Sequence, residues 1–175
     1  MTGMAYLTDG QSAALLALVA AGSAGQQQEV PVGAVLRDAA GRFLGECGNN
    51  QIAAHDPTGH AELRLLRQGA ARVGNYRLTG STLTVTLEPC PMCLAALGMA
   101  RVVQVTYEAR NPLLGTASAF PTPEQHYQPV VDAEYVQDLD DADSIVVSSS
   151  AAHVTEPAAD AGLLLRIFFD NRRQI

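Results

Sequence analysis

The stretch that decides the fold is TLEPCPMC, residues 86–93, in which two cysteines three positions apart follow a run of β-branched residues. The run STLTVTL at 81–87 predicts a strand, and the residues after Cys90 predict a helix with Pro91 in its first turn, where a missing N–H costs nothing. Residues three apart in a first helical turn share a face, so Cys90 and Cys93 can hold one metal ion. The pair alone does not separate a redox dithiol, a structural zinc site and a catalytic metal centre.

A third ligand and a proton carrier stand thirty residues upstream, in GHAEL at 59–63. One imidazole and two thiolates are a typical ligand set for catalytic zinc, with a fourth position left for water. Positions i and i+2 of a helix point in different directions, so His60 and Glu62 share a site only if it lies over the helix end. We therefore predict that His60, Cys90 and Cys93 bind the metal and that Glu62 moves a proton from water to a leaving nitrogen.

Each of these residues has a plainer interpretation when it is taken alone. The cysteines fit a redox pair, His60 fits a buried core histidine, and Glu62 fits a solvated helix charge. A structural zinc site would need a fourth thiolate or imidazole. The candidates for that fourth ligand are Cys47, His55, His126 and His153. The joint occurrence of both motifs favours the catalytic centre.

Alternating helical and strand periodicity runs along residues 9–109 and then weakens. The order α-β-β-α-β-α-β predicts an α/β fold, a three-layer α-β-α sandwich around a central mixed sheet of about five strands. One domain is expected over 1–175, with a divergent C-terminal region from about residue 119. The expected helices are 9–23, 60–74, 89–100 and 161–175, and the expected strands are 30–38, 42–48, 81–87, 101–109 and 130–139. In the first helix, the buried stripe is expected to be Leu15, Leu16, Leu18 and Val19.

Composition narrows the class of protein further. Of 175 residues, 47% are hydrophobic and 17% charged, which is enough to build a full core. The net charge is −7 and lysine is absent, which argues against a large basic footprint for nucleic acid. No apolar run is long enough to span a bilayer, so no membrane partner is expected. Three cysteines, two of them in CxxC, favour a reducing compartment, and the cytoplasm is predicted.

Four segments, EVPVGAVL, HDPTGHAEL, NYRL and VTLEPCPMC, together resemble the cytidine deaminase-like zinc deaminases. The H-x-E…P-C-x-x-C signature of these enzymes is present, and the resemblance covers about residues 6–118. It points to the purine branch, which includes tRNA adenosine deaminases and guanine deaminases. It implies Zn²⁺ on His60, Cys90 and Cys93, proton transfer by Glu62, hydrolytic release of ammonia and a homodimer. It also implies substrate contacts for Asn49, which stands eleven residues before the zinc histidine, and for Ala61, Glu88 and Pro89.

The resemblance leaves two kinds of substrate to distinguish, tRNA and small aminated heterocycles. The tRNA enzymes typically carry Lys-Thr-Gly after the fifth strand, whereas this chain reads NPLLG at 111–115. With a net charge of −7, this favours a small aminated heterocycle as partner: a free nucleobase or nucleoside, of the guanine type. The residues expected to cover such a pocket are Leu113, Leu114 and Phe120.

Two alternatives stay open. The C-terminal FFDNRRQI resembles the last helix of the tRNA enzyme and supplies Arg172 and Arg173, which keeps wobble-adenosine deamination in tRNA as the runner-up. A non-catalytic zinc-bound partner subunit is the lesser alternative. Such proteins often lose the glutamate of H-x-E, and Glu62 is present.

Overall fold

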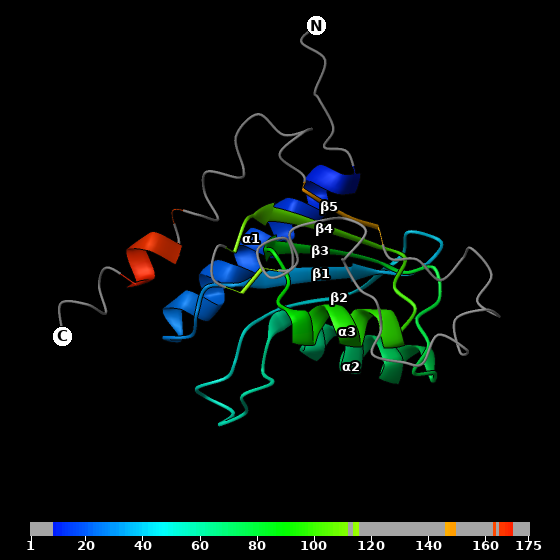
Figure 1. Ribbon diagram of the computed structural model, residues 1–175, viewed down its shortest axis with the longest axis horizontal. Coiled ribbons are helices and arrows are strands. Elements are labelled where there is room, and N and C mark those ends of the chain that lie inside the picture. The colour runs from blue at the N-terminus through cyan, green and yellow to red at the C-terminus, as the bar shows by residue number, and fades with distance from the viewer. Residues whose placement is uncertain (1–8, 112–113, 116–145, 150–162, 164, 170–175) are drawn as a thin grey trace, which may run out of the picture.

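The computed structural model describes residues 9–111, 114–115, 146–149, 163 and 165–169 (Figure 1). These residues form a five-stranded mixed sheet with the strand order β2-β1-β3-β4-β5. β1 runs antiparallel to β2 and β3, while β3, β4 and β5 run parallel. The strands are β1 (Gly33–Arg37), β2 (Phe43–Gly48), β3 (Thr82–Leu87), β4 (Gln104–Ala109) and β5 (Val146–Ser149).

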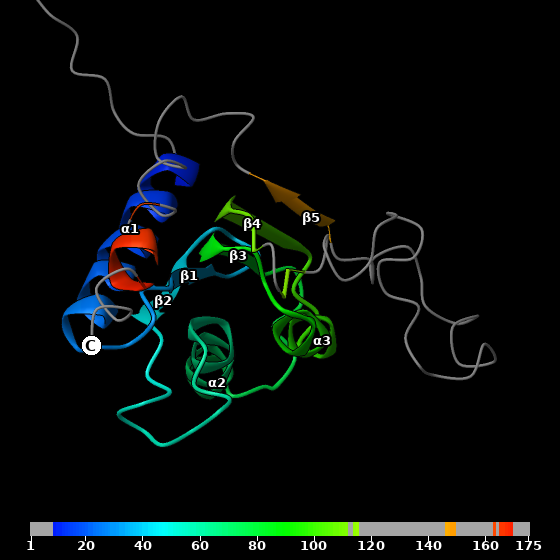
Figure 2. The ribbon, with the colours of Figure 1, turned by 60° about the vertical axis from the view of Figure 1, so that its left-hand side comes forward.

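Helices cover both faces of the sheet, as the end-on view in Figure 2 shows. α1 (Asp9–Gln26) lies on one face, and α2 (Ala61–Val73) and α3 (Pro91–Met99) lie side by side on the other. This confirms the predicted three-layer α/β fold. The main core fills the space between the sheet and the α2–α3 layer, and its largest fully buried members include Leu36, Leu65, Leu83, Val85, Leu97 and Val105.

The predicted buried stripe of α1 is wrong. Leu15 and Val19 are 53% and 59% exposed, and Leu16 and Leu18 are only partly buried. The buried face of the helix consists instead of alanines, namely Ala13, Ala14, Ala17, Ala20, Ala21 and Ala24.

Close packing of α1 on β1 explains the alanine face. A Cβ added to Gly33 would lie 2.1 Å from the Ala17 carbonyl oxygen and 2.4 Å from the Ala21 nitrogen. At such a separation of backbones only small side chains fit between helix and sheet. Side-chain size therefore determines which face of α1 is buried, and the hydrophobic pattern of the helix alone does not predict that face.

The C-terminal part agrees with the prediction only in places. The predicted strand at 130–139 lies outside the described residues, and β5 lies further along, where no strand was expected. β5 extends the parallel half of the sheet, with Val146 opposite Gln104. Residues 163 and 165–169 are helical, as expected for the last helix. No helix among the described residues is long and apolar enough to span a membrane, and the cytoplasmic location stays a prediction.

The pairing of β2 and β3 with β1 fixes where the two motifs meet. Both strands are antiparallel to β1, so β2 and β3 run in the same direction and end at the same edge of the sheet. α3 begins directly beyond β3, and α2 begins beside it on the same face (Figure 1). The edge at the carboxyl ends of the strands is the usual place for a functional site in α/β sheets.

Candidate metal centre

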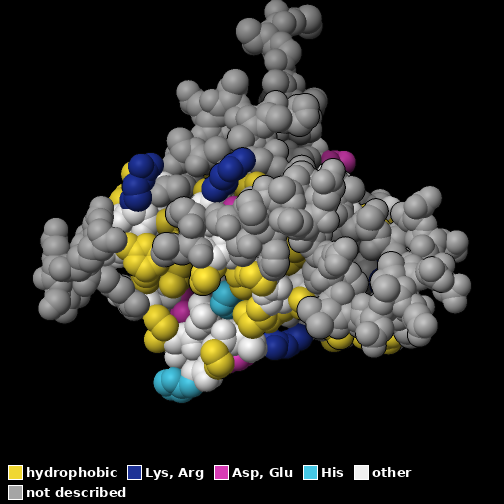
Figure 3. All heavy atoms as spheres, in the orientation of Figure 1, with side chains coloured by type: hydrophobic (Ala, Val, Ile, Leu, Met, Phe, Trp, Pro, Cys, Tyr) yellow, Lys and Arg dark blue, Asp and Glu magenta, His cyan; other side chains and the backbone are white. Residues whose placement is uncertain are grey.

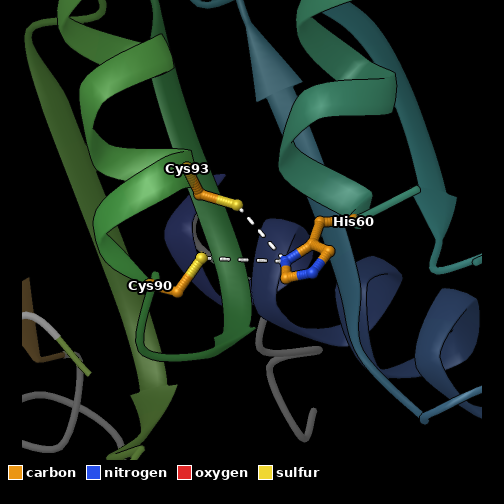
Figure 4. Close-up of side chains that lie close together, drawn as sticks. All are labelled: His60, Cys90 and Cys93. Atoms are coloured by element: carbon orange, nitrogen blue, oxygen red, sulfur yellow. Dashed lines mark hydrogen bonds between the residues drawn. The ribbon is translucent and has the colours of Figure 1, made fainter. Parts of the chain in front are cut away.

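Three predicted ligands converge between the starts of α2 and α3 (Figure 4). The Nδ1 atom of His60 lies 3.4 Å from the Cys93 sulfur and 3.8 Å from the Cys90 sulfur. The three donor atoms all lie within 4.8 Å of one another. One imidazole nitrogen and two sulfurs are a donor set that suits zinc, so the residues present fit this metal.

The local sequence places each ligand at a helix start. His60 and Cys90 are the N-cap residues of α2 and α3, both with extended backbone, at φ −73° and −76°. Pro91 occupies the first turn of α3, where its fixed φ is compatible with the helix and its missing N–H is not needed. Cys93 is the third residue of α3, in its first turn, and is fully buried. An N-cap residue stands outside the helical spiral, which lets His60 turn toward the cysteines.

The hydrogen bond between the two thiols shifts their pKa values in opposite directions. Donation from Cys93 lowers the pKa of Cys90 to about 4. The same bond raises the pKa of Cys93. The hydrogen bond with Cys90 raises the pKa of His60. A lowered thiol pKa favours thiolate, which is the form that binds zinc.

Glu62 lies in the first turn of α2 and is 3% exposed. Burial raises the pKa of its carboxyl group above the usual range. Its Oε2 atom has no hydrogen-bond partner, one of the few such buried side-chain atoms in the described part of the chain. His60 precedes α2 and Glu62 lies in its first turn. Both residues therefore lie at the start of the helix, where the i, i+2 spacing allows them to share one site. A buried carboxylate with one open oxygen beside the ligand set is suited to proton transfer.

Asn49 lies directly beside the ligand-bearing helix. Its Oδ1 accepts a hydrogen bond from the Ala61 N–H at 2.9 Å, and the side chain is buried. Its Nδ2 makes only a long 3.5 Å contact with Gln51 and keeps donor capacity. The Ala61 carbonyl accepts the Cys47 thiol at 3.3 Å. Asn49 is thus held with its amide nitrogen as the remaining donor, while a substrate contact by Ala61 stays a prediction.

Glu88 and Pro89 lead from β3 into the metal centre and are both buried. The Glu88 N–H donates to the Ala109 carbonyl at 2.8 Å, and its carboxylate accepts the Asn111 N–H at 3.1 Å. Glu88 therefore holds the segment that follows β4. The predicted substrate contacts of Glu88 and Pro89 stay predictions.

The predicted cover of the pocket is described only at Leu114, since Leu113 and Phe120 lie outside the described residues. Leu114 is 62% exposed, and its N–H donates to the Asn111 side-chain oxygen at 3.0 Å. Its side chain therefore faces solvent in the loop after β4.

The fourth ligand of a structural site is not found in the described part of the chain, where the cluster has three members. Burial raises the pKa of Cys47 to about 11, so it is a neutral thiol, bonded to Ala61. His55 is exposed, while His126 and His153 lie outside the described residues. The described geometry thus fits the open, three-ligand centre.

A buried glutamate outside both motifs also bears on the site. Glu29 is 1% exposed, and its carboxylate accepts hydrogen bonds from Ile52 and Ala53, in the loop before His60. Glu29 was not predicted from the sequence, because it closes the polar segment GQQQE and its partners are more than twenty residues away. Its one signal is a charged residue directly before the apolar VPVGAVL.

Comparison with known proteins defines the class. The model of the cytidine and deoxycytidylate deaminase zinc-binding region matches residues 8–109, which is more than half of the chain. The chain belongs to this family, and it is a zinc-dependent hydrolytic deaminase. Zinc is the cofactor, and His60, Cys90 and Cys93 are the clustered residues that could hold it.

Within the family, the similar proteins include several that act on tRNA. The tRNA-specific adenosine deaminase of Agrobacterium fabrum is 42% identical over 120 residues, 66% of this chain and 78% of that protein. The tRNA(Ile)-lysidine synthase of Deinococcus deserti is 52% identical over 99 residues, 57% of this chain but only 19% of that much longer protein.

Solved structures show the same similarity. A structure from a study of A-to-I editing by tRNA:A34 deaminases has 34% identity and a TM-score of 0.69, covering 88% of this chain and 99% of its own. Guanine deaminase from Bacillus subtilis has 31% identity and a TM-score of 0.52, covering 62% and 66%.

These comparisons overturn the predicted small-molecule partner. The curated relatives from Agrobacterium fabrum and Haemophilus influenzae are tRNA-specific adenosine deaminases, and the A34 deaminase structure matches over more of the chain than the Bacillus subtilis guanine deaminase does. The prediction of a free guanine-type heterocycle as partner, made largely from net charge, is therefore wrong.

The distribution of charge explains the error. Residues 119–160 contain nine Asp and Glu and no Arg, so this stretch alone carries −9. The rest of the chain has 11 Arg against nine Asp and Glu, a net charge of +2. Four of those nine acids are buried glutamates, at positions 29, 62, 88 and 108. Net charge over the whole chain therefore says little about the charge that the deaminase portion presents to a polyanion.

Proposed function

We propose that this protein deaminates adenosine in tRNA to inosine, at the wobble position of an anticodon. The observation that carries the proposal is the combination of the three-ligand centre and buried Glu62 with 34% identity to an A34 deaminase structure covered over 99% of its length. The relative that is an adenosine deaminase specific for tRNA supports the proposal, because the match covers 78% of that protein.

The described residues divide the chemistry among them. When bound at His60, Cys90 and Cys93, zinc supplies the Lewis acid that makes water a nucleophile near neutral pH. Glu62 accepts the proton that the attacking water loses and returns it to the exocyclic nitrogen. A C–O bond forms, the C–N bond breaks, and ammonia leaves. The raised pKa of Glu62 suits both halves of this transfer, because a carboxyl group with a pKa closer to neutral can accept and donate a proton.

Asn49 is proposed to orient the base. Ala61 fixes the Asn49 carbonyl oxygen, so the amide N–H groups are directed by the same contact. A donor fixed at the mouth of the centre can pair with a ring nitrogen or carbonyl of the target base. Pre-organisation of this kind lowers the entropic cost of binding the base in the reactive position.

Ammonia release from a panel of substrates tests the proposed function. The panel contains an anticodon stem-loop with wobble adenosine, the same stem-loop with guanosine at that position, free adenosine, guanine, guanosine and cytidine. Turnover is expected only for the wobble-adenosine stem-loop, with inosine as its product, and none in the Glu62→Gln variant. Turnover of guanine or of a free nucleoside, without inosine in the stem-loop, would contradict the proposal.

We also propose that the protein is a homodimer through the α2–α3 layer. Figure 3 shows hydrophobic side chains over α3; Met99, the last residue of α3, and Tyr76, in the turn after α2, are 74% and 66% exposed. Burying such side chains in an interface removes apolar surface from water.

Sedimentation is expected to give twice the 18.4 kDa chain mass, and Met99→Arg is expected to give the monomer. The control Phe43→Arg, on β2, should leave the dimer intact, and a monomeric wild-type protein would refute the dimer.

A further inference from the structure

Glu29 joins the end of α1 to a loop of the metal centre. Its carboxylate is engaged through both oxygens: Oε1 accepts the Ala53 N–H at 2.7 Å, and Oε2 accepts the Ile52 N–H at 3.1 Å. Glu29 itself is 1% exposed, and its own N–H donates to the Ala24 carbonyl at 3.0 Å. The acceptor is therefore fixed in the body of the protein, close to where β1 begins.

The two donors open a tight turn at 51–55. Within this turn the Ala54 N–H donates to Asn50, the His55 N–H to Ile52, and the Asp56 N–H to Gln51. The first N–H groups of a helical turn have no partner inside the turn itself, and here the Glu29 carboxylate satisfies them. Hydrogen bonds that backbone N–H groups donate to a carboxylate are among the stronger ones in proteins.

Packing contributes little to holding this turn. Residues 52–55 are all exposed, and the Ile52 side chain is 46% exposed. An exposed turn without a buried side chain is held mainly by its hydrogen bonds, so its position depends on fixed acceptors such as Glu29.

The ends of the same loop carry residues of the site. Asn49 begins the loop and His60 follows it, and the loop is closed by the Asn50 N–H donating to Gly59 at 2.9 Å. Across the closed end, the Asn49 side chain accepts the N–H of Ala61. The loop that contains the turn at 51–55 therefore joins a candidate base contact at one end to a candidate ligand at the other.

We propose that Glu29 is a positioning residue for the active site: its carboxylate fixes the turn at 51–55 and thereby sets the placement of Asn49 and His60. This role rests on the proposed function only for the choice of substrate. The carboxylate does not touch the reacting atoms. It acts by holding the loop that joins Asn49 to His60.

Glu29→Gln tests this role with little change of shape. Because a neutral amide replaces an ionised acceptor of two N–H bonds, KM for the substrate that the wild type converts is expected to rise about tenfold, with a smaller change in kcat. Hydrogen exchange at the amides of Ile52 and Ala53 is expected to speed up about tenfold. Zinc content and melting temperature should stay close to wild type. The matched control is Glu46→Gln, an exposed glutamate on β2, which should change none of these quantities.

Glu29→Ala, which removes both acceptors, is expected to exceed Glu29→Gln in both KM and exchange. Unchanged KM and unchanged exchange in Glu29→Gln would overturn the proposal. So would a lower melting temperature with an unchanged KM, because that result describes a purely structural role. The exchange measurement needs no substrate. It therefore tests the anchoring by Glu29 even if the wild-type protein leaves the stem-loop unreacted and the proposed function fails.

Discussion

Glu62→Gln is expected to lower the rate of deamination by about 10³-fold while zinc stays bound, which is in the range for losing a general acid–base group. Glutamine keeps the size of the buried side chain but cannot accept the proton from water. The Glu62 side chain is 3% exposed and one of its oxygens has no hydrogen-bond partner. Bulk water therefore has little access to take over the proton transfer. The measurement is single-turnover deamination of the stem-loop, combined with zinc content by mass spectrometry.

Glu46→Gln is the control for Glu62→Gln, since it makes the same chemical change at an exposed position on β2. It should retain wild-type rate and zinc. A Glu62→Gln variant that loses its zinc along with its activity would show that Glu62 supports the centre structurally. A variant that retains the rate would remove Glu62 from the reaction altogether.

Cys93→Ala is expected to lose the metal and several kcal/mol of stability, because metal affinity contributes to the free energy of folding. Cys93 is fully buried, and its thiol supplies the hydrogen bond that lowers the pKa of Cys90. Removing it deletes one ligand and weakens the thiolate character of another. Zinc content and thermal unfolding, each measured with and without added zinc, check this expectation.

Cys47→Ala is the matched control for Cys93→Ala. It also removes a thiol close to the centre, but Cys47 bonds to the Ala61 carbonyl and is not among the three clustered donors. It should keep one zinc per chain and lose only about 1 kcal/mol, as an ordinary partly buried substitution does. If Cys93→Ala kept a full complement of zinc, the ligand set would be wrong.

The metal centre could be predicted from sequence because its determinants are local. Each ligand stands at a helix start marked by its own motif, and Pro91 fixes where α3 begins. The H-x-E spacing requires a site over the helix end, and the structure places His60 at the N-cap with Glu62 in the first turn. β2 and β3 are both antiparallel to β1, and they bring both helix starts to one edge of the sheet.

The features that sequence did not predict depend on contacts between distant segments. The alanine face of α1 is set by its close approach to Gly33, which no periodicity in α1 records. β5 is four residues long and follows an acidic stretch, so its pattern is weak without its partner β4. Glu29 acquires its role from a loop more than twenty residues away. The net charge gave a wrong prediction of the substrate for a related reason. The position of the charged residues along the chain matters more than their sum.

Zinc titration of the metal-free protein is the most direct test of the central claim, that the cluster of His60, Cys90 and Cys93 is a hydrolytic zinc centre. Zinc is removed by chelation and returned in steps, while inosine formation in the wobble-adenosine stem-loop and ammonia release are followed together. Activity is expected to rise in proportion to bound zinc and to stop rising at one equivalent per chain. Full activity in the metal-free protein would contradict the account, as would zinc binding at one equivalent without any gain in ammonia release.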